Sequence, residues 1–483
     1  MIGVSQRKNT SGYIVNLWRR EVGSIAPRTF ADSVCASEGI YKSLGIERKL
    51  KEHRGCVNTL CFNSDGNILL SGSDDQKIIL WDWQIGSSKC SLHTGHTKNI
   101  FHVQFMPWSN DTSIITCSAD GQVRHIHMLE RATIRVLGEQ LGPVNRMAIE
   151  PGSANTFYTC SEAGLVTHFD LRTNEPTVLL SVTDPSLFVV ELYDIAIDPT
   201  NPNLVAVAGS DESARIYDIR KWGGDNNLSP SNGLVGCLTP IQSSNSKSYG
   251  ITGLAYSNRG ELLASHSWGD IYLFPRDHVL FKSNSSLDDI EMSEPKIFRG
   301  HTNKRTIKGV YFLGPGCEYV ASGSDSGHVF IWRKRDAELL RALKGDRFVV
   351  NCIEPHPLVP SLATSGIEND VKIWAPQSFE REDSKIEVDM ADECVNALSS
   401  EDEYSSLYFS LTASEDDSLY ASEDDYDDDD NSDVNDDGDD IDVDSKDDDD
   451  GDDIDVDSKD DDDDDDDSRD GGGEGDFISE DEL

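Results

Sequence analysis

Apolar and polar residues alternate along many short segments of the chain, with a period of two residues. Examples are residues 56–62 (CVNTLCF), 100–105 (IFHVQF) and 307–312 (IKGVYF). A period of two places successive side chains on opposite faces of a β-strand. Clusters of Asp, Gly and Ser separate these segments, and tight turns favour these residues. The pattern therefore predicts an all-β body of short antiparallel strands.

One phrase recurs seven times: a run of small residues, then an acidic or turn residue, then an alternating segment, as in SGSDDQKIILWD (71–82). The position of the Trp in this phrase recurs at intervals of 45, 43, 48, 57, 58 and 42 residues. The residues at this position are Trp81, Ile126, Phe169, Tyr217, Phe274, Trp332 and Trp374. The intervals match the WD-repeat period of about 40 to 45 residues, with two longer insertions. Seven units predict a seven-bladed WD-repeat β-propeller over residues 46–376.

A histidine precedes the first strand of several units, as at His53, His96 and His301. In the first unit, His53, Asp75 and Trp81 are suited to one hydrogen-bonded cluster inside a blade. The turn Asp would accept a hydrogen bond from the His, and the His ring would pack toward the Trp. We interpret these residues as structural, because the repeat requires them, and expect no metal ligands among them.

A small four-stranded sheet cannot bury both of its faces alone, so the blades must stack around an axis. We expect the segment just before His53, residues 46–51, to form the outer strand of the last blade. Pairing the two ends of the repeat in this way removes an open sheet edge.

Three further regions lie outside the regular strands. Residues 13–45 have an apolar pattern of helical character, broken near Pro27, which predicts two short helices in an N-terminal segment 1–45. The alternative is a leader without fixed structure, because short helices without packing are marginal. Segments 222–248 and 276–298 are rich in Ser, Asn and Asp, and we expect exposed loops there.

The acidic charge is concentrated at one end of the chain. Residues 391–483 hold 44 acidic and 3 basic residues, which leaves 45 acidic and 39 basic residues for 1–390. We expect a polar linker at 377–420 and a disordered Asp-rich acidic tail at 421–483, whose composition cannot bury a core. The tail would repel phosphates and no run of Lys or Arg offsets it, so we expect no direct binding to nucleic acid.

The remaining composition predicts the compartment. The sequence has no run of about 18 apolar residues, so we expect no membrane-spanning segment. The first 22 residues lack a continuous apolar stretch, so we expect no secretory signal peptide. Ten cysteines are scattered without a C-x-x-C pair, which predicts reduced thiols and a protein of the nucleus and cytoplasm.

Motifs of catalysis and cofactor binding are absent from the sequence. It contains no G-x-x-x-x-G-K-[ST], no G-x-G-x-x-G and no H-E-x-x-H. We therefore expect no cofactor, no metal site and no catalytic residues.

Two consecutive units end differently from the other five. The third ends in FDLR (169–172) and the fourth in YDIR (217–220), both of the form aromatic-Asp-x-Arg. Two guanidinium groups on adjacent blades suit bidentate anchoring of a partner's carboxylates or carbonyls. The alternative is that each Arg simply pairs with the Asp of its own blade. The candidate docking residues are Asp170, Arg172, Asp218 and Arg220.

This double box resembles that of the WD-repeat substrate receptors of the cullin-4 RING E3 ubiquitin ligase, the cullin-4-associated factor family. The segments 69–83 (LLSGSDDQKIILWDW), 308–315 (KGVYFLGP) and 363–376 (ATSGIENDVKIWAP) are similar to the branch that contains associated factor eight and its plant relatives. The resemblance covers about residues 15–378. Phe169 and Tyr217 stand where the family's box usually has Trp.

The resemblance implies that the box docks the propeller on the large β-propeller adaptor of the ligase, supported by a helical element within 13–45. It also implies a non-enzymatic receptor that recruits a protein substrate, of unknown identity, for ubiquitination by other subunits. One alternative is a histone- or basic-protein-binding WD-repeat scaffold that acts through its acidic tail. A second alternative, a propeller enzyme, would need catalytic residues at one mouth of the channel, and the sequence offers none.

Overall fold

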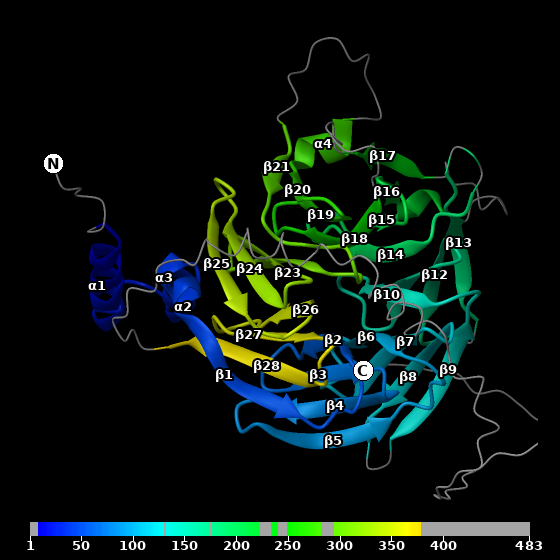
Figure 1. Ribbon diagram of the computed structural model, residues 1–483, viewed down its shortest axis with the longest axis horizontal. Coiled ribbons are helices and arrows are strands. Elements are labelled where there is room, and N and C mark those ends of the chain that lie inside the picture. Colours follow the sequence, from blue (N-terminus) through cyan, green and yellow to red (C-terminus); the bar gives the residue numbers. More distant parts are fainter. Residues whose placement is uncertain are drawn as a thin grey trace, which may run out of the picture. The chain divides into compact units, whose positions relative to one another are not determined.

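The computed structural model describes residues 8–129, 132–173, 175–184, 186, 188–222, 233–239, 249–281 and 294–377. Within this part of the chain, seven four-stranded antiparallel sheets lie around a central axis (Figure 1). The predicted seven-bladed propeller is confirmed. Apart from residue 377, the predicted linker 377–420 and the tail 421–483 lie outside the described residues.

Each blade has a first, second, third and outer strand, counted from the axis outward. The first strands are β2 (Val57–Phe62), β6 (Ile100–Phe105), β10 (Val144–Ile149), β14 (Leu192–Ile197), β18 (Tyr249–Tyr256), β22 (Val310–Leu313) and β26 (Val350–Pro355). The second strands are β3 (Leu69–Ser73), β7 (Ser113–Ser118), β11 (Thr156–Ser161), β15 (Leu204–Gly209), β19 (Leu262–Ser267), β23 (Tyr319–Gly323) and β27 (Leu362–Gly366). The third strands are β4 (Lys77–Asp82), β8 (Gln122–His127), β12 (Leu165–Asp170), β16 (Ala214–Asp218), β20 (Ile271–Phe274), β24 (His328–Arg333) and β28 (Asp370–Pro376). The outer strands are β5 (Ser87–His93), β9 (Thr133–Glu139), β13 (Thr177–Ser181), β17 (Leu234–Leu238), β21 (Lys296–Phe298), β25 (Leu339–Lys344) and β1 (Leu44–Lys51).

The ring closes by pairing the two ends of the repeat. Strand β1 runs antiparallel to β28, with Leu50 opposite Val371 and Leu44 opposite Pro376. The predicted closure by residues 46–51 is therefore confirmed, and the strand begins two residues earlier, at Leu44.

Among the described residues, seven hydrophobic clusters fill the spaces between neighbouring blades. One cluster, between the last blade and the first, joins Leu50 and Val371 to Val57 and Trp81. The predicted Trp position falls near the end of the third strand in every blade, and the residues there are buried throughout. Each cluster therefore joins two sheets, which is how a blade buries the face that it cannot cover alone.

Helices precede the propeller, as predicted, but they number three among the described residues: α1 (Lys8–Glu21), α2 (Pro27–Cys35) and α3 (Glu38–Lys42). Pro27 is the first residue of α2, because proline is preset for a first helical turn. The five-residue α3 was missed because its helical pattern is too short, and packing of Tyr41 against Tyr319 stabilises it. None of the described helices is both long and apolar enough to span a membrane.

Two predicted loops contain outer strands, so those predictions were wrong in part. Segment 222–248 includes β17, and segment 276–298 includes α4 (Arg276–Phe281) and β21. A short 3₁₀ turn, Ile219–Lys221, precedes the first of these segments. Outer strands face solvent along one edge, so their sequences lack the strong apolar alternation of the inner strands.

Candidate functional site

The antiparallel strand order gives the propeller two different faces. The turns from first to second strand and from third to outer strand lie at one face, which we name the lower face. The turns from second to third strand, and the loops from each outer strand to the next blade, lie at the other, the upper face. Every loop can therefore be assigned to a face from the strand order alone.

The first predicted docking pair, Asp170 and Arg172, lies at the lower face where β12 ends. The Arg172 guanidinium donates from Nε to Asp170 Oδ1 (2.9 Å) and from Nη2 to Oδ2 (2.7 Å). The Arg172 amide donates to the same carboxylate at 2.9 Å. The Arg172 side chain remains 68 % exposed. These hydrogen bonds from Arg172 lower the pKa of Asp170 to about 2.

The second pair, Asp218 and Arg220, has the same geometry at the end of β16. Arg220 Nε donates to Asp218 Oδ1 (2.9 Å) and Nη2 to Oδ2 (2.7 Å). Asp218 is the N-cap of the 3₁₀ turn and accepts from the Arg220 amide. The guanidinium is 65 % exposed while the carboxylate is largely buried. The hydrogen bond from Arg220 lowers the pKa of Asp218.

Each arginine is thus paired with the Asp of its own blade. This pairing holds the guanidinium in one orientation and leaves most of the side chain exposed to solvent. The carboxylate takes one edge of the planar guanidinium, and the exposed remainder keeps donors for a partner. The structure brings both pairs to one face on neighbouring blades, the third and the fourth.

Helices α2 and α3 lie at the same face, beside the sixth and seventh blades. Arg333, at the end of β24, donates to Glu38 of α3 from Nη2 (2.8 Å) and Nε (3.1 Å). The Tyr319 hydroxyl donates to the Ala36 carbonyl at 2.8 Å. Both propeller residues lie at lower-face ends of their strands, so α2 and α3 are anchored to that face.

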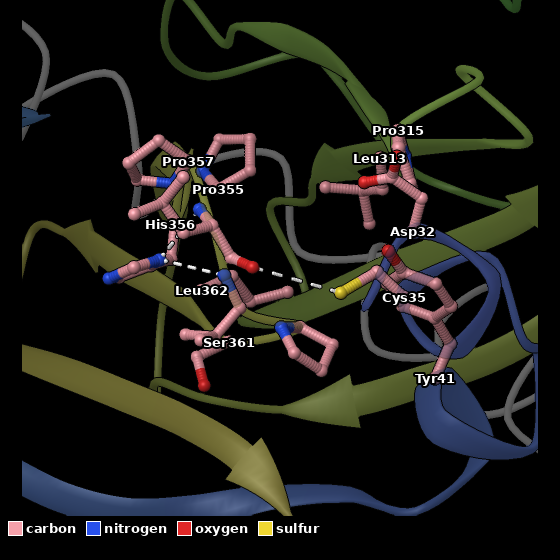
Figure 2. A pocket seen from close by; sticks show the side chains of 14 residues that line it. Asp32, Cys35, Tyr41, Leu313, Pro315, Pro355, His356, Pro357, Ser361 and Leu362 are labelled. Atoms are coloured by element: carbon pink, nitrogen blue, oxygen red, sulfur yellow. Dashed lines mark hydrogen bonds between the residues drawn. The ribbon is translucent and has the colours of Figure 1, made fainter. Parts of the chain in front are cut away.

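A small pocket of about 80 Å³ separates these helices from the propeller (Figure 2). Cys35 of α2 and Tyr41 of α3 line one side, and the proline-rich loop 355–362 lines the other. The Cys35 thiol contacts the Leu358 carbonyl, with an S···O distance of 3.9 Å. Pockets for small ligands span about 300–1,000 Å³, so this one is a packing gap between helix and loop.

Sequence reasoning missed the exposed apolar side chains of the lower face. The Trp108 indole is 81 % exposed in the turn between β6 and β7. Trp108 also has a positive φ of 61°, which is strained for a bulky side chain. Similar exposed apolar side chains in lower-face turns of the seventh, first and second blades are Leu358, Val359, Ile85 and Leu129. The only sequence signal was an apolar residue inside a turn.

Helix α1 adds a further exposed apolar surface. Ile14, Leu17 and Trp18 of α1 are exposed, and so is Val22, which follows the helix. The helix contacts α2, where Arg20 lies over the Phe30 ring at 5.0 Å. An apolar helix side that remains exposed is typical of a protein-binding segment.

The predicted blade cluster has a different position and geometry from the docking pairs. His53 Nδ1 lies 2.9 Å from Asp75 Oδ2, and His53 Nε2 lies 2.7 Å from Ser71 Oγ. Trp81 Nε1 donates to the same Ser71 oxygen at 2.8 Å. The side chains of His53 and Trp81 are buried inside the first blade. Ser71, which sequence reasoning did not name, joins the histidine to the tryptophan.

One acidic group in the described part of the chain has oxygens close enough together for a metal ion: Asp346, Glu368 and Asp370. The buried ammonium of Lys372 forms ion pairs with all three carboxylates. We therefore interpret this group as an internal ion cluster of the last blade.

Comparison with known proteins identifies the repeats. The family model "WD domain, G-beta repeat" matches residues 45–82, 88–126 and 292–333. The chain is a WD-repeat β-propeller protein.

Similar proteins indicate which WD-repeat proteins this chain is related to. The chain is 38 % identical to human and mouse "WD and tetratricopeptide repeats protein 1" over 208 residues. This aligned region covers 42 % of this chain and 31 % of the relative. It is 32 % identical over 275 residues to human "DDB1- and CUL4-associated factor 6", covering 54 % of this chain and 32 % of the relative. It is 28 % identical over 328 residues to "Protein ALTERED SEED GERMINATION 2" of Arabidopsis thaliana, covering 56 % and 43 %. The chain thus aligns with about one third of the length of the first two relatives, and its homologues include a DDB1- and CUL4-associated factor.

Proposed function

We propose that this chain is a non-enzymatic substrate receptor of a cullin-4 RING ubiquitin ligase, and that its lower face docks on the large β-propeller adaptor. One observation carries the proposal: Arg172 and Arg220 lie at the same face as helices α2 and α3. The similarity to DDB1- and CUL4-associated factor 6 supports the choice of partner.

The lower face has the chemistry of a protein interface. Helices α2 and α3 lie beside the sixth and seventh blades. Going round the ring from there, exposed apolar side chains lie in lower-face turns of the seventh, first and second blades. Arg172 and Arg220 lie in lower-face turns of the third and fourth blades. Aromatic and Arg side chains are the residues that dominate binding energy at interfaces. Arg172 and Arg220 would donate to carboxylates or carbonyls of the adaptor, while Trp108 and α1 would supply apolar contacts.

The mechanism that we propose is proximity. Docking through the lower face leaves the upper face free to hold a protein target. Ubiquitin transfer is then performed by other subunits of the ligase, and this chain supplies only position and selectivity.

The test is capture of purified adaptor by the wild-type chain and by the Arg172→Ala/Arg220→Ala double variant at moderate salt. The matched control is Arg299→Ala, because Arg299 is 71 % exposed and also paired with an Asp of its own blade, Asp270, but at the upper face. We expect binding to fall at least tenfold in the double variant and to be unchanged in the control. Equal binding by the double variant, with its melting temperature unchanged, would refute the docking role.

A second function is favoured by the charge of residues 391–483, with 44 acidic and 3 basic residues. A scaffold that binds histones or other basic proteins would use this tail directly. In that case deletion of 421–483 abolishes binding to basic proteins, and substitution of Arg172 and Arg220 leaves it unchanged.

A further inference from the structure

The upper face has an exposed tryptophan at a position where other blades have an acid. The strand register places Trp268 of the fifth blade at the same position of the turn between second and third strands as Asp75 and Asp120 of the first and second blades. The Trp268 side chain is 53 % exposed, and its φ of 57° is strained for a bulky residue. Neither burial nor backbone preference therefore explains a tryptophan in this turn.

A hydrogen-bonded loop holds this turn in place. The Trp268 amide donates to the Asn303 carbonyl at 2.7 Å. The buried side chain of Asn303 donates to Thr252 Oγ1 at 2.8 Å and to the His266 carbonyl at 3.2 Å. Lys304, the next residue, has its Nζ 4.6 Å from the centre of the Trp268 ring. The exposed ring and the exposed ammonium are thus held together before any ligand binds.

The loop that contains Lys304 is longer than its counterpart in the first blade. Seven positions separate His53 from Leu60 of the first strand, whereas nine separate His301 from the equivalent Val310 of the sixth blade. The longer loop also contains Ile307, whose side chain is exposed.

The same loop is joined to the next blade. Thr306 Oγ1 donates to Asn351 Oδ1 at 2.6 Å, and the Gly309 amide donates to the Asn351 carbonyl at 3.2 Å. The loop just before the strand of Asn351, residues 345–349, contains Arg347 and Phe348, both of them exposed. We name the following five residues the upper-face patch: Trp268, Lys304, Ile307, Arg347 and Phe348.

The carboxylates in the turns next to the patch are paired with other cations. The three ion pairs are Asp270–Arg299, Asp325–Lys308 and Glu368–Lys372. Among the described residues, the side chains of Lys304 and Arg347 form no ion pair. In the next two loops between blades, Arg54 and Lys98 are exposed as well. The patch therefore offers positive charge to an external anion.

We propose that the upper-face patch binds an acidic segment of a partner protein, and that this segment also contains aromatic or aliphatic residues. Lys304 and Arg347 would pair with its carboxylates, while Trp268, Ile307 and Phe348 would bury its apolar side chains. A purely charged ligand would leave these apolar groups in water. The proposal deepens the proposed function and rests on it in one respect: the segment would belong to a target of the ligase.

The charge of the remaining upper face favours a protein segment over a single-stranded nucleic acid. The loops 140–143 and 182–191 contain no Lys or Arg and include Asp184 and Glu191. A phosphate backbone needs a positively charged path along its length, and here positive charge is confined to one side of the face.

Selection of a random displayed peptide library on the full-length chain tests the proposal. We expect the enriched peptides to combine Asp or Glu with Trp, Phe, Leu or Ile. Fluorescence polarisation then measures the affinity of the strongest peptide. We expect the Lys304→Glu/Arg347→Glu variant to bind it about tenfold more weakly, because two attractive charges become repulsive. Arg259→Glu/Arg335→Glu, the same change of charge in lower-face turns, is the matched control and should bind as the wild type does.

A second variant removes the aromatic ring without disturbing the turn. Asn tolerates a positive φ better than Trp, so Trp268→Asn should keep the fold. We expect it to bind the selected peptide about fivefold more weakly. Leu141→Asn is its control, because Leu141 is exposed on the same face in loop 140–143 and lies outside the patch. If the charge-reversed variant does not fold, the comparison of Trp268→Asn with Leu141→Asn decides.

Four outcomes overturn the proposal. They are selection of no peptide, enrichment of peptides that lack either acidic or apolar residues, and unchanged affinity in the Trp268→Asn variant. The fourth is tighter binding of oligouridylate than of any selected peptide, which would assign the patch to single-stranded nucleic acid. The experiment contains no adaptor, so failure here leaves the docking proposed for the lower face intact, and failure of that docking leaves the peptide result intact.

Discussion

Arg172 donates side-chain hydrogen bonds from Nε and Nη2 to the Asp170 carboxylate, and this contact decides how the guanidinium is presented at the lower face. A free arginine side chain samples many rotamers, and ordering it on binding costs affinity. Asp170 holds the Arg172 side chain in one conformation before binding, which reduces that cost, and Asp218 does the same for Arg220. The carboxylates therefore act as positioning residues for the proposed contact with the adaptor.

The Asp170→Asn/Asp218→Asn variant isolates this positioning. Both arginines and their charges remain, but each loses a charged acceptor, so we expect adaptor affinity to fall about 3- to 10-fold. The smaller loss in comparison with the Arg172→Ala/Arg220→Ala variant distinguishes positioning from direct contact. Titration of labelled adaptor measures both, and an unchanged affinity in the Asn variant would show that the pairs are only blade architecture.

Ser71 is the junction of the buried cluster of the first blade. Trp81 donates to the Ser71 oxygen, the Ser71 hydroxyl can donate to His53 Nε2, and His53 Nδ1 then donates to Asp75. We expect Ser71→Ala to lower the free energy of unfolding by about 2 kcal/mol, because it leaves two buried ring nitrogens without a partner. Thermal melting compares this variant with Ser87→Ala, whose serine is exposed on β5. Equal melting temperatures would contradict the assigned role.

Sequence periodicity predicted the ring because every blade must bury apolar side chains at the same positions of its sheet. The third strand must bury a large apolar side chain, so even Ile126 and Phe169 could be placed where the repeat usually has Trp. The outer strands β17 and β21 escaped prediction because they face solvent and have little alternation.

The candidate docking face was predictable only in part. The two arginines follow a local motif, whereas the exposed Trp108 lies in a turn whose direction depends on the whole blade. The ion cluster of Lys372 had a sequence signal that was overlooked. Asp346 follows Gly345 at the position where His96 follows Gly95, so the last blade has an acid where the first, second and sixth blades have a histidine.

Lys372 holds together three carboxylates of the last blade. Its side chain is fully buried with Asp346, and Asp370 lies nearly buried beside them. We expect Lys372→Met to destabilise the propeller by about 3–5 kcal/mol, because the removed cation leaves buried negative charges uncompensated. The double variant Lys372→Met/Asp346→Leu should recover much of that loss, since it removes one uncompensated charge. Melting temperatures of the single and double variants measure the recovery, and a double variant that is less stable than the single variant would contradict the coupling.

Glu354 gives the propeller a specific dependence on pH. It lies on β26, a first strand, near Arg146 of β10, and the Phe62 amide donates to it at 3.4 Å. Burial raises the pKa of Glu354 from 4.5 to about 7, against the opposing effects of the Phe62 amide and Arg146. The folded chain therefore binds a proton more tightly than the unfolded chain does. The resulting stabilisation is complete below pH 4.5 and is lost as pH rises to about 7.

We expect the wild-type chain to lose about 1–2 kcal/mol of stability from this group between pH 5 and pH 8, less than the full shift implies because the residue retains some contact with solvent. Glu354→Gln cannot ionise, so its stability should change less over the same interval. Glu139→Gln, at an exposed position of β9, is the matched control and should keep the wild-type dependence. Denaturation of all three chains at pH 5, 6, 7 and 8 measures the difference. Parallel curves for wild type and Glu354→Gln would show that Glu354 is already ionised at pH 5 in the folded chain.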